Sequence, residues 1–497
     1  MNWDAWIPLL MVASSLVPGL IIFGLAEDRV RVRTMLNLAG ALLKLVFVGW
    51  MLWGVYNGHH YETRLALLPN LDLVLRAGPL ALLFVTLSSV LWMVTTVYAI
   101  GYLEGSPHRS RFFGFFSLCV TATVGVALAG NLITFLLFYE LLTLATYPLI
   151  VHRGTEEARR AGQSYLAYTI TGGALLLLGT VWLYSLTGTL EFIPRGFLSG
   201  LDNEHRPVLI IIFALMIAGL GVKAALVPLH GWLPKAMIAP APVSALLHAV
   251  AVVKAGAFGI VRVVYEVFGV DFAAGLGVLA PLAWIAAITI IYGSLRALYQ
   301  DDLKRRLAFS TISQVSYIAL GVAIAGPIAT IGGVVHLVHQ GLMKITLFFC
   351  AGNLAETLGI HKISEMNGVG RRMPWTMTAF TIGAFGMIGA PPIAGFVSKW
   401  YLGLGALQAD QGWVIAVLAG SSLLNSAYFL PILYRAWFRE PAGAWPEEHD
   451  FGRKETAWTL LLPPLLTAAL ALGAGLLALM PFSPLEWAKL ISVREFY

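Results

Sequence analysis

Two apolar segments, VKAALVPLHGWLP at residues 222–234 and GAPPIAGFVSK at residues 389–399, each combine helix-breaking prolines with a lysine. Proline removes a helical hydrogen bond and clashes with the preceding turn. The breakers are Pro228, Pro234, Pro391 and Pro392. Irregular backbone at membrane depth survives only where protein or a water-filled cavity covers it, and paired broken helices are typical of transporters built from inverted repeats. The two segments therefore predict two broken membrane helices, although proline kinks used only for packing remain an alternative.

The composition around these segments is that of a membrane protein. Of 497 residues, 58% are hydrophobic and 12% are charged, and the mean hydropathy is +0.79. The apolar residues fall into runs long enough to cross a bilayer as helix, which takes roughly 20 residues. The first run, Trp6 to Phe23, lacks a basic flank and a small-residue cleavage site, so we expect a retained span and not a signal peptide.

These runs predict an all-α polytopic membrane protein with about 14 transmembrane helices. The expected spans lie near residues 5–25, 35–56, 78–102, 112–130, 132–151, 164–187, 207–227, 240–265, 272–295, 308–326, 328–355, 374–402, 412–434 and 457–480. Five-helix units near 112–265 and 272–434 would run in opposite directions, because five is odd. We therefore expect an N-terminal three-helix segment (1–110), two inverted five-helix repeats (111–270 and 271–440), and a C-terminal transmembrane helix with its tail (441–497).

Loop charges predict the orientation. Most of the 32 lysines and arginines fall in loops on one side, with clusters at 29–33, 304–306, 371–372 and 453–454. Lysine and arginine gather on the cytoplasmic side of membrane proteins. We therefore expect both termini outside the cytoplasm, in a bacterial plasma membrane. The net charge of +6 reflects this topology and gives no indication of nucleic-acid binding.

The sequence offers no redox centre. Cys119 and Cys350, the two cysteines, both lie in apolar runs, and an iron–sulfur cluster needs about four thiolates. No phosphate loop or dinucleotide motif opens a βαβ unit, and no attachment motif supports a haem. We expect no metal and no bound cofactor, so any electron carriers would belong to another chain, and whether the chain serves an enzyme stays open.

Charged residues within the predicted spans are the candidates for function. They are Glu140, Lys44, Lys223, Lys254, Lys344 and Lys399. Each costs about 2.5–3.5 kcal/mol on insertion scales, and such groups usually face a protein interior or a water-filled path. Desolvation favours the neutral forms of lysine and glutamate, so these groups are suited to take up and release protons. The alternative is a set of structural ion pairs or snorkelling lysines, and only for Lys44 do we favour snorkelling or packing.

Histidines extend this set. His336, Gln340 and Lys344 follow one helical face at i, i+4 and i+8, and His339 lies one turn from His336. His248 precedes Lys254 by six residues in the same span. A lone histidine on an apolar face is usually a hydrogen-bonded core residue, but several in register with lysines indicate a proton relay.

Five motifs carry a resemblance to a known family. They are FYELL (138–142), VPLHGWLP (227–234), APVSALLHA (241–249), VKAG (253–256) and LKRRLAFSTISQ (303–314). The chain resembles, over roughly residues 80–440, the antiporter-like subunits shared by Mrp-type cation/proton antiporters and respiratory complex I. The resemblance implies fourteen helices with two inverted five-helix repeats, each with a broken helix.

The resemblance also implies roles for eight residues, which we call the relay candidates. Glu140 matches the glutamate of the fifth helix, and Lys223 matches the lysine of the broken seventh helix with which that glutamate pairs. The relay candidates are Glu140, Lys223, His248, Lys254, His336, His339, Lys344 and Lys399. Together they imply a hydrophilic axis along the membrane plane, with Lys399 at its end.

Departures from the family pattern refine the expectation. Gln340 stands where the distal complex I subunit has a second histidine, whereas His339 fits the pattern of the D-type Mrp protein. Lys235 occupies a place where an acid or neutral residue is commoner, and we treat it as cytoplasmic charge. We expect a D-type component of an Mrp-type monovalent cation (Na⁺)/H⁺ antiporter, working with other membrane subunits in the bilayer. The alternative is a proton-pumping subunit of an NADH:quinone oxidoreductase or membrane-bound hydrogenase, and a variant couples the module to an inorganic-carbon partner.

Overall fold

The computed structural model describes residues 3–69, 71–201, 203–441, 443–449, 451 and 454–497. Arg453, part of one predicted basic cluster, lies outside them. The first half of the chain contains α1 (Trp3–Phe23), α2 (Val30–Tyr56), β1 (Tyr61–Leu68), β2 (Leu71–Ala77), α3 (Pro79–Tyr102), α4 (Arg109–Leu128), α5 (Leu132–Ile150), α6 (Glu156–Thr187), α7 (Arg206–Lys223), α8 (Trp232–Lys235), α9 (Ala241–Ala249), α10 (Val252–Arg262) and the π-helix η3 (Val263–Phe268).

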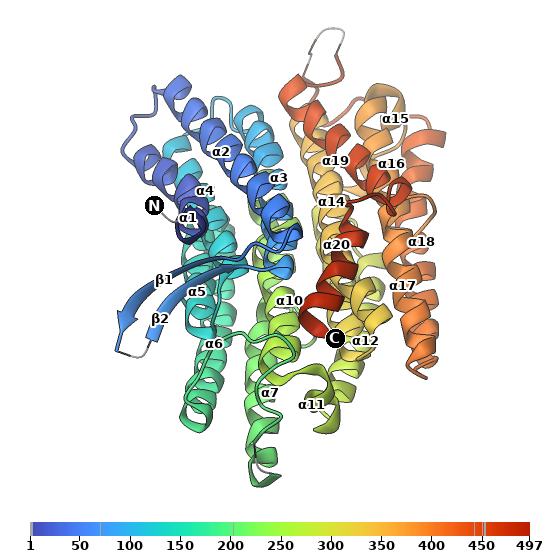
Figure 1. The fold of residues 1–497 in the computed structure, drawn as a ribbon. Helices are drawn as coiled ribbons and strands as arrows, with labels where there is room; N and C mark the ends of the chain where they lie inside the picture. The colour runs from blue at the N-terminus through green and yellow to red at the C-terminus, as the bar shows by residue number, and fades with distance from the viewer. Residues whose placement is uncertain (1–2, 70, 202, 442, 450, 452–453) are drawn as a thin grey trace.

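The second half is also helical. It contains α11 (Val270–Gly275), α12 (Leu279–Leu298), α13 (Leu303–Ala323), α14 (Pro327–Leu358), α15 (Val369–Arg372), α16 (Pro374–Ile388), α17 (Ala394–Gln408), α18 (Trp413–Phe438), α19 (Trp458–Leu476), α20 (Pro484–Ile491) and the π-helix η5 (Ser492–Phe496). Figure 1 shows the N-terminal helices α1 and α2 at one flank of the bundle and α16–α18 at the other.

Local signals place the helix starts. Proline opens α3, α14, α16 and α20, where its missing N–H costs nothing. Side-chain oxygens cap three other starts: Asn131 accepts from the Thr134 N–H, Thr155 from the Ala158 N–H, and Asp302 from the Arg305 N–H.

Every predicted span overlaps a helix, and the chain is a multi-pass helical membrane protein. Within the described residues, 12 helices are long and apolar enough to cross a bilayer. The two remaining predicted spans correspond to α13, which is rich in serine and threonine, and to the split pair α16–α17 of 15 residues each. The number 14 and the inverted repeats stay predictions.

Two long helical segments form the centre of the bundle. The most apolar stretches of Ala241–Phe268 and of α14 are completely buried within the protein. Helix α14 packs against α9, α13, α16, α17 and α19. Six of the eight relay candidates lie on these central segments or beside them in α17, so the fold buries most of the predicted axis.

A β-hairpin between α2 and α3 was not predicted from the sequence. Strands β1 and β2 pair antiparallel with Glu62 opposite Arg76 and Arg64 opposite Val74. In Figure 1 the hairpin extends beyond the helices. Both strands lie between two predicted spans, where the apolar runs predict only a connection, because an eight-residue strand gives a much weaker signal than an apolar helix.

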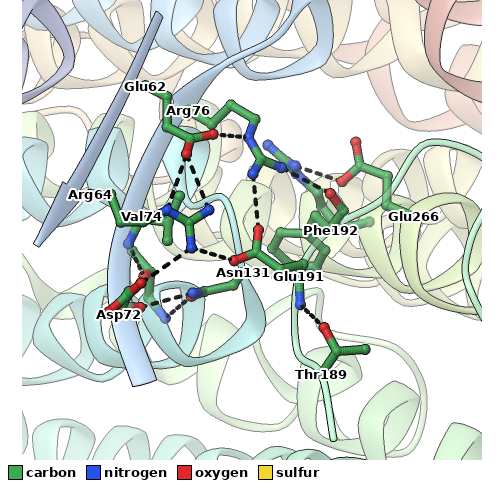
Figure 2. A network of polar contacts seen from close by, with 12 residues as sticks. Glu62, Arg64, Asp72, Val74, Arg76, Asn131, Thr189, Glu191, Phe192 and Glu266 are labelled. Carbon is green, nitrogen blue, oxygen red and sulfur yellow. Dashed lines mark hydrogen bonds and ion pairs between the residues drawn. The ribbon is translucent and has the colours of Figure 1, made fainter. Parts of the chain in front are cut away.

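Ion pairs fasten the hairpin to the loop after α6 (Figure 2). Arg76 contacts Glu62 at 2.6 Å and Glu191 at 2.9 Å, and Arg64 contacts Glu62, Asp72 and Glu191 at 3.0–3.2 Å. Partial burial alone would raise the pKa of Glu62, but Arg76 and Arg64 together hold it below its usual value. The hairpin network (Glu62, Arg64, Asp72, Arg76 and Glu191) therefore depends on an ionised carboxylate.

This dependence predicts that acid loosens the hairpin. Because the pKa of Glu62 is lower in the folded state than in the unfolded state, its contribution to stability is complete above about pH 4.3 and is lost as the pH falls through the folded value. We expect hydrogen-exchange protection of β1 and β2 to drop in acid before that of α14, and Glu62→Gln to weaken protection already at neutral pH. Equal protection of the hairpin in Glu62→Gln and the unmodified chain would contradict this.

Candidate functional site

The first predicted break is present. Helix α7 ends at Lys223 and the next helix, α8, begins at Trp232, with Pro228 in the connection and Pro234 inside α8. Lys223 is buried. Its Nζ donates to the Tyr139 carbonyl and lies 3.4 Å from the centre of the Tyr139 ring. The break thus brings the lysine ammonium directly onto α5.

Glu140, also on α5, does not pair directly with Lys223. The two side chains interact electrostatically, but no ion pair joins them among the described residues. The half-buried carboxyl lies against Gly173 of α6, where an added Cβ would collide with Oε1, and the buried Oε1 has no hydrogen-bond partner. The predicted pair of Glu140 and Lys223 is therefore not in direct contact in this structure. The ammonium of Lys223 instead contacts the backbone carbonyl and the ring of Tyr139.

A further break, which the sequence analysis missed, separates α9 from α10 at residues 250–251. His248 lies in the last turn of α9 and Lys254 in the first turn of α10. Both are fully buried. No proline or glycine marks this break, and the span predicted at 240–265 is present but is interrupted in its middle.

Helix α14 carries three relay candidates facing these residues. His336 Nδ1 shares a hydrogen bond of 2.8 Å with the Ser398 hydroxyl on α17. Lys254 interacts electrostatically with both His336 and His339, and Lys344 interacts with His248. The structure therefore brings the candidates of α9, α10 and α14 together.

The second predicted break is also present. Helix α16 ends at Ile388 and α17 begins at Ala394, with Pro391 and Pro392 between them. The Lys399 ammonium donates to the freed carbonyls of Met387 and Ile388 at 3.0 and 2.8 Å and to the Ser422 hydroxyl at 3.0 Å. The lysine thereby satisfies carbonyl groups that a helix end leaves without partners.

A hydrogen-bonded chain connects Lys344 to Lys399 through side chains that the sequence analysis did not select. Lys344 Nζ donates to Ser310 Oγ at 2.7 Å, and the Tyr428 hydroxyl donates to the same oxygen at 2.9 Å or to Asn425 Oδ1 at 2.5 Å. Asn425 Nδ2 donates to the Met387 carbonyl, which also accepts from Lys399. Spacing alone cannot reveal this chain, because its members come from α13, α14, α16, α17 and α18.

Within the part of the chain that the structure describes, other buried polar atoms at the centre have no hydrogen-bond partner. They are Lys254 Nζ, both ring nitrogens of His248 and of His339, His336 Nε2, and the amide groups of Gln314 and Gln340. Buried polar groups are nearly always hydrogen-bonded to protein or ordered water. This concentration of unsatisfied donors and acceptors is typical of a functional site and not of a structural core.

Two other lysines lie apart from the relay candidates. Lys44 is fully buried and donates to the Met11 carbonyl at 2.8 Å and to Ser15 Oγ at 2.9 Å, which is packing and not snorkelling. Lys235 is exposed and lies 3.4 Å from Ser164 Oγ. Within the described residues, no group of three or more His, Cys, Asp or Glu side chains is arranged to hold a metal ion.

The chain is similar to proteins of two kinds of complex. It is 37% identical, over 84% of its length and 83% of the relative, to NADH-quinone oxidoreductase subunit N of Desulforudis audaxviator. It is 29% identical, over 81% of its length and 80% of the relative, to the D component of the Na⁺/H⁺ antiporter of Alkalihalophilus pseudofirmus.

Solved structures show the same fold. A chain of the Mrp complex from Dietzia sp. superposes with a TM-score of 0.88 at 23% identity, covering 100% of this chain and 98% of that one. A chain of the archaeal membrane-bound sulfane sulfur reductase gives 0.87 at 26% identity, with 98% of each covered. The model of the family described as "NADH:quinone oxidoreductase/Mrp antiporter, TM" matches residues 129–425. This chain therefore belongs to the NADH:quinone oxidoreductase/Mrp antiporter transmembrane family.

Proposed function

We propose that this chain moves protons along a buried axis in the membrane, as an antiporter-like subunit of an Mrp-type monovalent cation (Na⁺)/H⁺ antiporter complex. The observation that carries the proposal is the row of titratable side chains buried along α9, α10 and α14, which leads to the partly buried Lys399 on α17. Buried ionisable groups in a membrane protein are expensive and usually mark an ion path.

The geometry supports a sequence of steps. A proton enters at Glu140, whose approach to Lys223 changes the charge at the break of α7. Lys254 and the histidines then carry the proton toward α14, and Lys344 or His336 hands it toward Lys399. Water molecules bridge the buried atoms that have no partner in the protein.

The proposed assembly contains other membrane subunits, since the superposable chains belong to multi-subunit membrane complexes. In the proposed orientation the hairpin and both termini face away from the cytoplasm, because the loops on that side are poor in lysine and arginine. The segments 111–270 and 271–440 act as the two inverted repeats, each containing one of the proline-broken helices.

A second function is favoured by the relative at 37% identity, which is a subunit of a redox complex. In that case the same axis pumps protons for an NADH:quinone oxidoreductase or membrane-bound hydrogenase, and partner chains hold the electron carriers. The buried relay candidates serve either function equally well.

Gentle purification of the native complex separates the two functions. We expect small hydrophobic subunits without redox proteins, and a pH change in everted vesicles that depends on added sodium. If flavin, iron–sulfur or nickel proteins co-purify and no sodium-dependent pH change is seen, the redox-driven function is correct and the antiporter function is not. A preparation that transports no protons under either energy source would overturn the proposal as a whole.

A further inference from the structure

A second group of buried ionisable residues lies beyond the relay candidates, where η3 meets η5. Arg262, Glu266 and Glu495 are 6%, 3% and 9% exposed. Arg262 Nη1 lies 2.5 Å from Glu266 Oε2, and its Nη2 donates to the Ala127 carbonyl at 3.0 Å. We call these three residues the release cluster.

Glu495 is held firmly in this cluster. Its Oε2 accepts from the Leu80 N–H at 3.1 Å, at the start of α3. The neighbouring Phe496 ring stacks on Tyr265 of η3 with centroids 4.0 Å apart. An added Cβ on Gly78 would collide with Glu495 Oε1, so the carboxyl fills the space beside that glycine.

The charges of the cluster do not balance when both carboxyls are ionised. Glu266 and Glu495 interact with each other and with the single buried guanidinium of Arg262. The other cations nearby have their own partners: Arg494 donates to the Val55 and Tyr56 carbonyls, and Arg76 pairs with Glu62 and Glu191. Two close carboxylates that share one cation favour a state in which one of them keeps a proton.

The cluster lies on the same helical segment as Lys254. Arg262 follows Lys254 by eight residues, about 12 Å along the helix at 1.5 Å per residue, and Glu266 lies one turn further. Phe258 lies between them and packs 5.1 Å from the Arg262 guanidinium. On its far side the cluster adjoins the hairpin network, since Arg76 acts electrostatically on Glu266. Figure 2 labels both residues, with Arg76 bonded to Glu62, Glu191 and the Phe192 carbonyl.

We propose that Arg262, Glu266 and Glu495 form a proton-release site, in which Glu495 takes the proton from Glu266 and gives it to water on the hairpin side of the membrane. The proposal rests on the proposed function, because it gives that relay a second outlet, on the helical segment that carries Lys254, beside the route toward Lys399. In the transfer, the O–H bond of the Glu266 carboxyl breaks and an O–H bond forms on Glu495, while the Glu266 carboxylate pairs again with Arg262. Release to water then returns Glu495 to the ionised state.

The groups facing Glu495 set the pH range. Burial first, and then Glu266, raises the pKa of Glu495 to about 8, while Arg262, the Leu80 N–H and Arg494 act in the opposite direction. Arg195, in the loop after α6, donates its backbone N–H to the Glu495 backbone carbonyl. Its guanidinium donates to the Tyr497 backbone carbonyl. Glu495 is therefore protonated at rest near neutral pH and ionises as the pH rises through about 8. In each cycle it first releases its proton to water, and the carboxylate that remains then takes the next proton from Glu266.

Infrared spectroscopy and transport of the assembled complex test this proposal. We expect a protonated-carboxyl band in the unmodified complex that fades as the pH rises through about 8 and is absent in Glu495→Gln. Glutamine keeps the shape and an acceptor for the Leu80 N–H, so assembly is retained while transport falls by about tenfold or more. Glu486→Gln, on the neighbouring α20 and paired with Lys489, is the matched control and keeps both band and transport.

A second variant moves the carboxyl without removing its proton. Gly78 has φ −92°, which alanine adopts readily, and the added methyl must displace Glu495 Oε1. We expect Gly78→Ala to shift the pH profile of transport and the pH at which the band fades. A band that Glu495→Gln leaves intact, or transport by that variant at the unmodified rate with an unchanged pH profile, would overturn the release site. If Glu140→Gln and Glu495→Gln both transport normally, the proposed relay itself is overturned. If Glu140→Gln loses transport but Glu495→Gln does not, only the release site is overturned.

Discussion

Glu140→Gln is expected to abolish proton transport while the complex still assembles. Glutamine matches the shape of glutamate but cannot take up a proton, and Glu140 is the one acid near the break of α7 that interacts with Lys223 in the described structure. Its carboxyl lies against Gly173 without a hydrogen-bond partner on Oε1, so no structural bond of that atom is lost. We expect a loss of about a hundredfold or more, as for removal of other positioned proton-transfer groups.

The measurement is proton uptake by vesicles that contain equal amounts of assembled complex. Glu156→Gln is the matched control, because Glu156 is an exposed glutamate whose one ion pair within the described residues is with Arg160, one turn away. Glu140→Asp, which keeps the carboxyl but shortens its reach toward Lys223, should recover part of the rate. Normal transport by an assembled Glu140→Gln complex would refute the proposed entry step.

The broken helices were predictable because their signal is chemical and local. Pro391 and Pro392 cannot continue a helix, and α16 ends three residues before the first of them. The break between His248 and Lys254 was not predictable in this way. It leaves no mark in the sequence, since Val250 and Ala251, which leave the helical conformation there, are ordinary apolar residues buried within the bundle.

The buried lysines were predictable because a charged residue within an apolar run is rare and easily recognised in a sequence. Their hydrogen-bond partners cannot be recognised in this way. Ser310, Asn425 and Tyr428 are ordinary residues of polar helix faces, and only the packing of α13 and α18 against α14 makes them neighbours of Lys344 and Lys399. Glu495 was missed in the same way, since its burial depends on contacts with residues far away in the sequence.

The second large effect is expected at Lys399, where two substitutions separate charge from proton transfer. Lys399→Met removes both the ammonium and its hydrogen bonds to Met387, Ile388 and Ser422. Lys399→Arg keeps a positive charge and several donors but cannot release a proton, because a guanidinium stays protonated in proteins. If Lys399 passes a proton onward, we expect both variants to lose transport by about a hundredfold.

Proton uptake in vesicles, with Lys235→Met as the control for an exposed lysine, checks this expectation. Near-normal transport by Lys399→Arg would mean that position 399 needs only a cation, which holds the ends of the broken helix together.

The hydrogen-bonded chain through Ser310, Tyr428 and Asn425 adds a graded test. Tyr428→Phe removes the hydroxyl between Lys344 and Lys399 but neither lysine, so it should slow transport without abolishing it, because His336 and Ser398 offer a second approach to Lys399.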